Sequence, residues 1–566
     1  MKRALIALAC GAACGRGVTV TVVTVDARPS VHAAATLSVE VANASSSFSQ
    51  DFDLHGHAFP ATFSVETPGR SGDLAITARA KDDAGAIVGI GTAAATIVDN
   101  DESDVALLLD PADFAVNTQI AGAQRTVFYT STGARQITAS LDGNFTVAWS
   151  DDCGSLARCD VWGRRFDKTG ASVATAIAAG TSQFNINRTS VFGTDAALAT
   201  GPDGTVLGLW TTYDEVNGGP GDILCSAIAP DGSAATPAEV TLSDGGAPDH
   251  VGVAAFKDQF LVVWQELRKS DNAPSIQLRF VDKTCAPLSG ALTLASSTTS
   301  APDTPAIATS LDGTEAAIVW RVGTSIRGRF VTGSSALGVD TQVIGGGNDA
   351  LWGPELTAMK GGYALVYGAK SADALPNGGY VLHRVKQGGG DLGIETVISA
   401  TAPDIFSVAS VTRRADDALA VAWHDCDTHG DGTGCGVFAQ LVRSTGLAVG
   451  APIVMDTTTT GDQTDPSIIA LPDAFAAVWT DGSMVPPDQS MTGIRARVLY
   501  PAYDDARGVL GAPCAADRPC GANLVCAIGS DKLSHCHAAC DPAGAPPLCP
   551  MGGACTNGPA GASCIF

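Results

Sequence analysis

The chain has 566 residues, of which 45% are hydrophobic and only 16% are charged, so it is globular and too long for one core. Its 34 basic and 58 acidic residues give a formal net charge of −24. Nucleic acid and anionic lipid are therefore excluded as expected partners, because both require a basic surface. The 64 glycines, with many Ala, Thr, Val and Asp residues, are typical of β-strands joined by turns.

Residues 1–14 have the features of an export signal. Lys2 and Arg3 precede the apolar segment Ala4–Ala13, which is too short to span a bilayer. Cys10 and Cys14 both follow small residues, which resembles the bacterial lipoprotein signal, where such a cysteine carries the lipid. Cys14 is the preferred anchor and Cys10 the alternative, because Cys14 leaves about ten apolar residues before it. A plain secretory signal or a misplaced start codon is the other interpretation.

Residues 17–110 predict a small antiparallel β-sandwich that is Ig-like or Calx-β-like in architecture. The expected strands alternate between apolar and polar residues and are separated by Pro, Gly, Ser and Asn clusters. They are Val18–Val25, Thr36–Val41, Ala61–Glu66, Asp73–Ala80 and Ala94–Val98. The ending Ile97–Asp101 resembles the tail of Calx-β modules, which implies an acidic calcium site. The favoured interpretation is a solvated acidic linker made by Asp99, Asp101, Glu102 and Asp104.

Residues 111–502 contain seven repeats, each with a short apolar segment that ends in an aromatic residue. These segments recur about every 55 residues, which indicates stacked supersecondary units. They are Phe145–Trp149, Val206–Trp210, Phe260–Trp264, Ala316–Trp320, Tyr363–Tyr367, Leu419–Trp423 and Phe475–Trp479. Each repeat reads as four strands, and the aromatic segment is the second of them.

The second strands are apolar on both faces, as in Phe145–Trp149, which predicts that each sheet is covered on both sides. Four-stranded sheets packed face to face around an axis form a β-propeller, here with seven blades. We expect the closing aromatics to pack between blades and not to form a ligand platform. The seventh repeat lacks a fourth strand, and Phe114–Ile120 is expected to supply it and so close the ring.

The repeats have the form PxhA–DG–hVVW–loop–hxxRFxxxG, where h is apolar. They are similar to repeats in large secreted proteins and lipoproteins of Gram-negative bacteria, notably myxobacteria. The resemblance covers the propeller region, and it implies propeller architecture and an envelope location. It implies no catalytic residue.

Fourteen further cysteines indicate an oxidising compartment. Three disulfides are expected in the repeats, namely Cys153–Cys159, Cys426–Cys435 and Cys225–Cys285. The segment 511–566 is too small for a sufficient core, so four further disulfides are expected there. Its eight cysteines form two quartets that resemble EGF-like or Dickkopf-type modules: Cys514, Cys520, Cys526 and Cys536, then Cys540, Cys549, Cys555 and Cys564. His535 and His537 flank Cys536 and offer a zinc alternative, which the export signal disfavours.

Calcium is the one cofactor that the sequence suggests. In Asp425–Gly434 (DCDTHGDGTG), the carboxylates of Asp425, Asp427 and Asp431 are spaced like the start of an acidic calcium loop. The segment lacks a Glu at the twelfth position, so a polar turn clipped by a disulfide is the favoured interpretation.

Signals for catalysis are weak. The segments Ser140–Gly143 and Ser310–Gly313 look like sialidase Asp-boxes, but their Gly comes one residue too early. The third strands carry recurring arginines that are expected around the rim and not in one carboxylate-binding cluster: Arg165, Arg279, Arg329, Arg384 and Arg497. The sequence contains no GxSxG, HExxH or P-loop pattern.

The sequence therefore predicts an all-β protein that is secreted or anchored at the bacterial cell surface. The expected function is non-catalytic binding or adhesion, with propeller loops presented to a protein or glycan partner. The alternative is a sialidase- or glycosidase-like hydrolase with its site at the mouth of the central channel. A third hypothesis makes the cysteine-rich tail the functional part and the propeller a spacer. Contact with a membrane is expected only through the N-terminal lipid.

Overall fold

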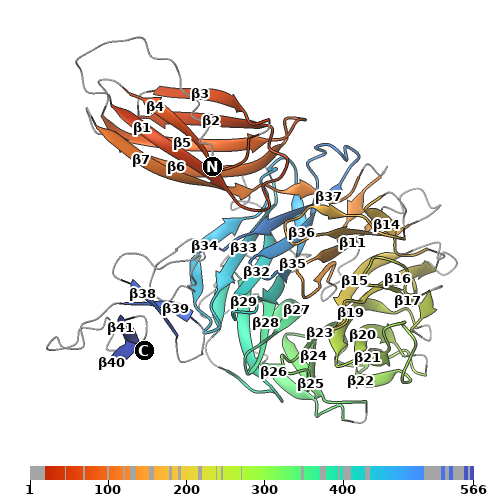
Figure 1. Cartoon of the computed structure of the whole chain (residues 1–566). Coiled ribbons are helices and arrows are strands. Elements are labelled where there is room, and N and C mark those ends of the chain that lie inside the picture. Colours follow the sequence, from red (N-terminus) through yellow and green to blue (C-terminus); the bar gives the residue numbers. More distant parts are fainter. Residues whose placement is uncertain are drawn as a thin grey trace, which may run out of the picture. The chain divides into compact units, whose positions relative to one another are not determined.

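The computed structural model of the chain is all-β (Figure 1). It describes residues 19–501, except 45, 56, 68–70, 98–100, 119–121, 128–134, 152–158, 178–180, 189–192, 215–218, 237–238, 244–245, 269, 335, 346–349, 370–377, 393–394, 400–408 and 427–433, and it describes four strands between 524 and 565. Residues 1–499 and 500–566 are two compact units. Within the described ranges we find no helix with the length and apolar character needed to cross a membrane.

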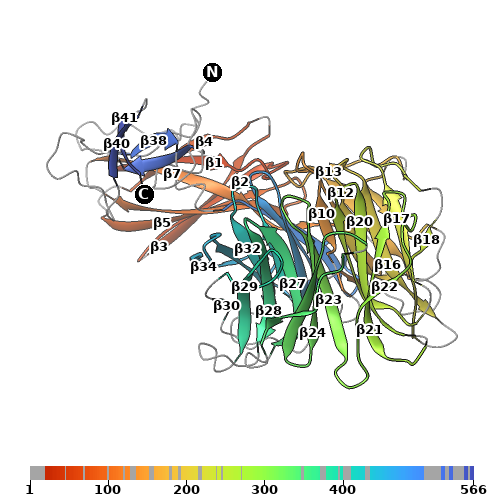
Figure 2. The ribbon, with the colours of Figure 1, turned by 90° about the horizontal axis from the view of Figure 1, so that it is seen from below.

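The N-terminal region forms one seven-stranded sheet in the order β3-β2-β5-β6-β7-β1-β4, which bends into a half-barrel (Figures 1 and 2). Its strands are β1 (Val20–Ala27), β2 (Thr36–Asn43), β3 (Ser46–Asp53), β4 (Ala61–Glu66), β5 (Gly72–Lys81), β6 (Ile87–Ile97) and β7 (Glu102–Pro111). The region predicted as a sandwich is thus a single curved sheet. Its two halves are joined where β6 pairs with β7 at Gly89–Pro111 and Ile90–Asp110, and they enclose one core.

Strand β7 corrects one sequence-based expectation. Glu102 and Asp104 were expected in a solvated linker, but they lie in β7, which runs parallel to β1. The acidic residues fit there because alternate positions of β7 face outward, and both side chains are exposed. Composition indicates solvent exposure, but it does not report whether the backbone pairs with another strand.

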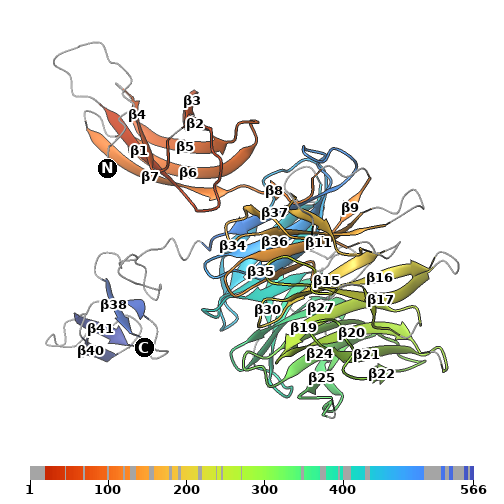
Figure 3. The ribbon, with the colours of Figure 1, turned by 45° about the vertical axis from the view of Figure 1, so that its right-hand side comes forward.

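Residues 114–499 form the seven sheets of a β-propeller, as predicted (Figures 1 and 3). Blades one to four are β10 (Ile137–Ala139), β11 (Phe145–Asp151), β12 (Val161–Phe166) and β13 (Ser172–Val173); β15 (Thr194–Thr200), β16 (Val206–Asp214), β17 (Gly219–Ile228) and β18 (Val240–Thr241); β19 (Asp249–Phe256), β20 (Gln259–Leu267), β21 (Pro274–Val281) and β22 (Leu292–Ser296); and β23 (Pro302–Thr309), β24 (Ala316–Val322), β25 (Ser325–Val331) and β26 (Thr341–Ile344). Blades five to seven are β27 (Ala350–Met359), β28 (Gly362–Ala369), β29 (Gly379–Lys386) and β30 (Thr396–Ser399); β31 (Ser410–Arg413), β32 (Leu419–Asp425), β33 (Gly436–Val442) and β34 (Ala448–Val454); and β35 (Gln463–Ala470), β36 (Phe475–Asp481), β37 (Gly493–Leu499) and β8 (Phe114–Ala115). Blade one also contains β9 (Gln124–Arg125) and β14 (Gln183–Asn185).

The ring is closed by β8, which pairs with β37 as the fourth strand of blade seven. The pairing covers Phe114 and Ala115 only, which is shorter than the expected segment Phe114–Ile120. The next residue continues the contact, because the Val116 N–H donates to the Ile494 carbonyl at 2.7 Å. The first strand of blade one, β10, contacts both β15 and β35, so the inner strands also form a complete ring.

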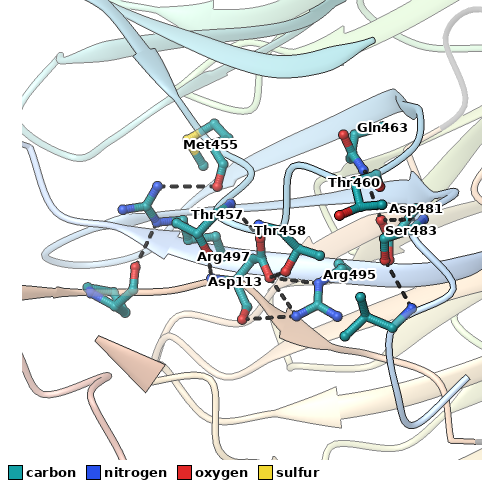
Figure 4. Close-up of polar contacts among 12 residues, drawn as sticks. Asp113, Met455, Thr457, Thr458, Thr460, Gln463, Asp481, Ser483, Arg495 and Arg497 are labelled. Atoms are coloured by element: carbon teal, nitrogen blue, oxygen red, sulfur yellow. Dashed lines mark hydrogen bonds and ion pairs between the residues drawn. The ribbon is translucent and has the colours of Figure 1, made fainter. Parts of the chain in front are cut away.

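Residues around the closing strand reinforce it (Figure 4). The Asp113 carboxylate receives hydrogen bonds from the Thr457 N–H at 2.5 Å, the Thr458 N–H at 2.8 Å and the Arg495 Nε at 2.6 Å. Arg497 donates to the carbonyls of Pro111 at 2.7 Å and of Val454 at 2.9 Å. We call the set Asp113, Thr457, Thr458 and Arg495 the closure clasp.

The seven closing aromatics are all buried, with exposed fractions of 3% or less. Each packs against the preceding blade where a shared core is seen, as Trp264 does with Leu207 and Leu209, and as Trp320 does with Leu261 and Val263. Burial of one such ring contributes about 4–6 kcal/mol as an upper bound. The repeat aromatics are therefore interior packing residues.

Two disulfides join described residues, Cys225–Cys285 and Cys426–Cys435. Cys225 lies in blade two and Cys285 in blade three, so that bond staples neighbouring blades. Cys159 is also disulfide-bonded, and its expected partner Cys153 lies outside the described residues. These bonds indicate an oxidising environment.

The C-terminal unit contains two hairpins, β38 (Leu524–Ile528) with β39 (Ser534–Ala538), and β40 (Ala554–Gly558) with β41 (Gly561–Ile565). In the backbone register Cys526 lies opposite Cys536, and Cys555 lies opposite Cys564. The third and fourth positions of the two quartets are thus related in the same way. The other four cysteines, Cys514, Cys520, Cys540 and Cys549, lie outside the described residues.

Candidate functional site at the channel mouth

The inner strands of five blades carry a break in register near their first residues. The breaks lie between Thr194 and Ala197, Asp249 and Gly252, Asp303 and Ala306, Trp352 and Glu355, and Thr464 and Ser467. A β-bulge turns a side chain away from its regular direction, and bulges are over-represented next to functional sites. The bulges mark one end of the channel, and we call this end the channel mouth.

Four of these bulges contain a non-glycine residue with positive φ: Asp195 at 54°, His250 at 52°, Thr304 at 47° and Asp465 at 54°. The left-handed region is tolerated by Asp and His but is costly for a β-branched residue such as Thr304. Residues of this kind cluster at ligand clamps and active sites, where the surrounding structure holds them in place.

Hydrogen bonds between blades hold the bulges. The Thr304 N–H donates to Gln265 Oε1 at 3.2 Å, and the Asp465 N–H donates to His424 Nδ1 at 3.1 Å. The Thr126 N–H donates in the same way to Thr480 Oγ1 at 3.0 Å. Gln265, His424 and Thr480 each follow directly after a repeat Trp. One sequence position therefore fixes the bulge of the next blade.

Charged pairs lie at the same end. Arg321 binds Asp303 through two contacts, Nε to Oδ1 at 2.8 Å and an amino group to Oδ2 at 2.7 Å, and both side chains are about a quarter exposed. His250 Nδ1 lies 3.2 Å from the Asp249 carboxylate. Burial alone would raise the pKa of Asp249, but the hydrogen bond and charge of His250 hold it below its usual range. The mouth thus offers fixed, partly exposed polar groups of both signs.

An ion pair crosses the channel below these residues. Arg135 precedes β10 of blade one, and its Nε lies 3.0 Å from Oε1 of Glu355 in blade five. The same guanidinium donates to the carbonyls of Leu356 at 2.6 Å and Val411 at 3.2 Å. Blades one and five are three places apart in a ring of seven, so Arg135 spans the axis. We call the Arg135–Glu355 pair the channel bar.

The Glu355 carboxyl is fully buried, and burial raises its pKa above the usual range. Arg135, the Ser410 side chain and the Val411 N–H favour the ionised form, but they do not compensate for the loss of water. Glu355 stands where other inner strands have small residues: Ala197, Gly252, Ala306, Ser410 and Ser467. This single exception in a small-residue strand was the available sequence signal, and the repeat analysis did not use it.

A second carboxyl with a raised pKa lies in blade seven. Burial raises the pKa of Asp481, although Ser483 donates to it at 2.5 Å and Gln463 at 3.1 Å (Figure 4). Asp481 follows two residues after Trp479. It is 3% exposed, so it is an interior group of the blade.

The predicted calcium residues are only partly described. Asp425 ends β32 and is 8% exposed, whereas Asp427 and Asp431 lie outside the described residues. In the part of the chain that is described, no three His, Cys, Asp or Glu side chains are grouped as metal ligands. Calcium binding therefore stays a prediction.

The five recurring arginines contact backbone carbonyls at separate places. Arg165 donates to Pro230, Arg279 to Leu242, Arg329 to Gly338, Arg384 to Ser444 and Arg497 to Pro111. These contacts join strands or neighbouring blades, and none of them is with another arginine's carbonyl partner. The arginines therefore serve the packing of the ring.

The segments that resemble Asp-boxes are local turns. Ser140 donates to the Asp142 carboxylate at 2.5 Å, and Ser310 donates to Asp312 at 2.6 Å. The Ser140 hydroxyl lowers the pKa of Asp142 by stabilising its ionised form. These carboxylates are occupied by their own turns.

Neither a family model nor a curated protein matches this sequence. Similar solved structures include a protein of unknown function from Dyadobacter fermentans DSM 18053, with 10% identity over 69% of this chain and 99% of that chain and a TM-score of 0.38. The phage phi92 endosialidase is 9% identical over 76% of this chain and 74% of its own, with a TM-score of 0.40. An α-L-arabinofuranosidase from Fusarium graminearum is 10% identical over 69% and 98%, with a TM-score of 0.36. Such scores give no argument about activity.

Proposed function

We propose that the protein is an exported binding protein whose channel mouth holds a glycan. The observation that carries this proposal is the channel bar, because it gives the mouth a floor that consists of side chains from opposite blades. A ligand is then held at the surface of the mouth and does not pass through the ring.

The polar groups above the floor favour a ligand rich in hydroxyl groups. The Arg321–Asp303 pair presents planar donors and acceptors, and Asp249, His250 and Asp465 add further ones. Hydroxyl groups both donate and accept, so they match alternating groups of this kind. Inter-blade hydrogen bonds fix the bulges in advance, which reduces the entropy cost of binding.

The test is binding of the full chain to an array of bacterial and host glycans, followed by titration calorimetry with the strongest ligand. Arg321→Ala is expected to weaken binding at least about tenfold, because it removes a planar donor and frees Asp303. Arg327→Ala is the matched control, since Arg327 forms an ion pair with Asp340 in the same blade but on its third strand. Equal affinity of both variants, or no glycan binding by the wild type, would contradict the proposal.

A hydrolase is the second candidate, and the raised pKa values of Glu355 and Asp481 favour it. Glycoside hydrolysis requires one carboxyl that is protonated near neutral pH. Both groups are nearly inaccessible, which is why binding is the preferred function. Release of reducing sugar from a bound glycan, abolished by Glu355→Gln or Asp481→Asn with the chain still folded, would establish the hydrolase.

We further propose that the chain is anchored at the cell surface by a lipid on Cys14, with Cys10 as the alternative. The disulfides support export. The cysteine-rich unit is proposed as an adhesion or inhibitor module in its own right. Mass spectrometry of the mature N-terminus in the native host tests the anchor, and an unmodified N-terminus beyond residue 14 would exclude it.

A further inference from the structure

The N-terminal sheet is an open barrel with two edge strands, β3 and β4. These edges approach one another, because the rings of Phe52 on β3 and Phe63 on β4 are stacked with centroids 5.3 Å apart. Among the described strands, β3 pairs only with β2 and β4 only with β1. The open side of the half-barrel between β3 and β4 is called the seam.

The seam leaves an apolar row incomplete. On the inner face Ile76 lies opposite Val41, and Val41 lies opposite Phe48. Ile76 and Val41 are buried, but Phe48 is 63% exposed. Phe48 precedes Phe52 by four residues, or about 13 Å along a strand. The Phe52–Phe63 stack therefore covers one end of the seam, and the end at Phe48 stays uncovered.

Strand β3 has none of the usual protection of an edge. It pairs with β2 over eight consecutive residues without a bulge, and its sequence Ser46–Asp53 contains neither Pro nor Lys. Proteins commonly protect free edges with such features, because unpaired N–H and C=O groups attract another strand. A regular, unprotected edge next to an exposed aromatic ring is suited to accept a strand.

The charges along the seam define its partner. The outer face of β3 exposes Ser47, Ser49, Asp51 and Asp53, and β4 exposes Glu66. The basic residues Arg79 and Lys81 lie on β5, two strands away from the edge, and Arg79 is paired with Glu40. A strand added to β3 would meet an apolar inner row and an acidic outer row. The charges disfavour a second copy of this chain, which would bring the same carboxylates.

We propose that the seam binds an extended segment of another protein by β-strand addition to β3, with apolar residues facing Phe48 and basic residues facing Asp51 and Asp53. Backbone hydrogen bonds supply affinity in this mode of recognition, and alternate side chains supply specificity. This surface is separate from the channel mouth, so the two sites fail or succeed independently.

The test uses the full chain and two fluorescent eight-residue peptides, one alternating Val with Lys and one alternating Val with Glu. The Val–Lys peptide is expected to bind and the Val–Glu peptide to bind at least about tenfold more weakly. Phe48→Ser should weaken Val–Lys binding about tenfold, since the exposed ring loses its new contacts. Leu141→Ser is the matched control, because Leu141 is a 91% exposed apolar residue on a propeller turn.

Hydrogen exchange separates strand addition from general attraction to an acidic protein. The bound peptide should slow amide exchange in Ser46–Asp53 and leave the segment around Leu141 unchanged. Equal binding of the two peptides, no effect of Phe48→Ser, or protection spread over the whole chain would overturn the proposal. A concentration-dependent dimer that Phe48→Ser abolishes would also overturn it, because the occupant of the seam would be a second copy.

Discussion

The closure clasp and the channel bar each join a buried carboxylate to an arginine from a distant part of the chain, yet their carboxylates differ. Asp113 binds Arg495 and also accepts two backbone N–H groups and the Thr458 hydroxyl. Burial would raise the pKa of Asp113, but these partners hold it below its usual range. Glu355 is equally buried and has fewer close donors, so its pKa is raised.

The contrast shows that one arginine is not sufficient to keep a buried carboxylate ionised. The hydrogen bonds that replace lost water decide the outcome. In the clasp they come from the loop at Thr457 and Thr458, which lies between blades six and seven. In the bar, Arg135 also serves the carbonyls of Leu356 and Val411. The clasp is thus a structural ion pair, and the bar contains a carboxyl that is close to gaining a proton.

Loss of the clasp is expected to have the largest effect. Arg495→Met leaves the buried Asp113 charge without its counter-ion and should lower the free energy of unfolding by about 3–5 kcal/mol. Arg327→Met removes a partly exposed ion pair and should cost less than about 1 kcal/mol. Urea unfolding measures both. A cost for Arg495→Met no greater than for Arg327→Met would show that β8 closes the ring without the clasp.

Loss of the bar should cost less. Arg135→Met removes the partner of Glu355, but a carboxyl whose pKa is already raised can take up a proton, so we expect about 2 kcal/mol. The double variant Arg135→Met/Glu355→Met should recover part of this cost, since it also removes the buried acid. Unfolding free energies of the two single variants and the double variant give the coupling. Additive costs would mean that the bar is not a coupled pair.

The pH dependence of the two carboxylates should have opposite signs. The stability that Asp113 contributes is present above its unfolded pKa of about 3.9 and is lost as pH falls through its lower folded pKa. The contribution of Glu355 is complete below its unfolded pKa of about 4.3 and is lost as pH rises through its higher folded pKa.

Melting temperatures across the acid and neutral range measure this difference. Asp113→Asn should reduce the loss of stability in acid, and Glu355→Gln should reduce the loss on the side of rising pH. The change at each pH is expected to be of order 1 kcal/mol per carboxyl. Parallel curves for the wild type and both variants would mean that neither group changes its protonation on folding.

A neutral pair of residues tests the same rule with the smallest effect. The indole N–H of Trp264 donates to Glu266 at 2.7 Å, whereas that of Trp320 is buried without a hydrogen bond to the described residues. Both rings are fully buried at the same repeat position. Trp264→Phe should therefore cost about 1 kcal/mol more than Trp320→Phe in urea unfolding. Equal costs would indicate that an ordered water already satisfies Trp320.

Much of the fold is written into the repeats. Segments such as Phe145–Trp149 predict both their strands and their burial, because a strand covered on two sides must be apolar on two faces. The missing fourth strand of the last repeat likewise predicts that the chain near Phe114 closes the ring. Strands β3 and β7 were not expected, since polar residues such as Ser47 and Glu102 pair through their backbones and face water.

The sites were decided by the closed ring. Arg135 meets Glu355, and Asp113 meets Arg495, only because seven packed blades bring residues together that are hundreds of positions apart in sequence. The sequence by itself determined local periodicity, hence the strands, the turns and the number of blades. Tertiary structure alone determined which buried charges meet and how many hydrogen bonds replace their water, because both depend on long-range contacts that no local pattern records.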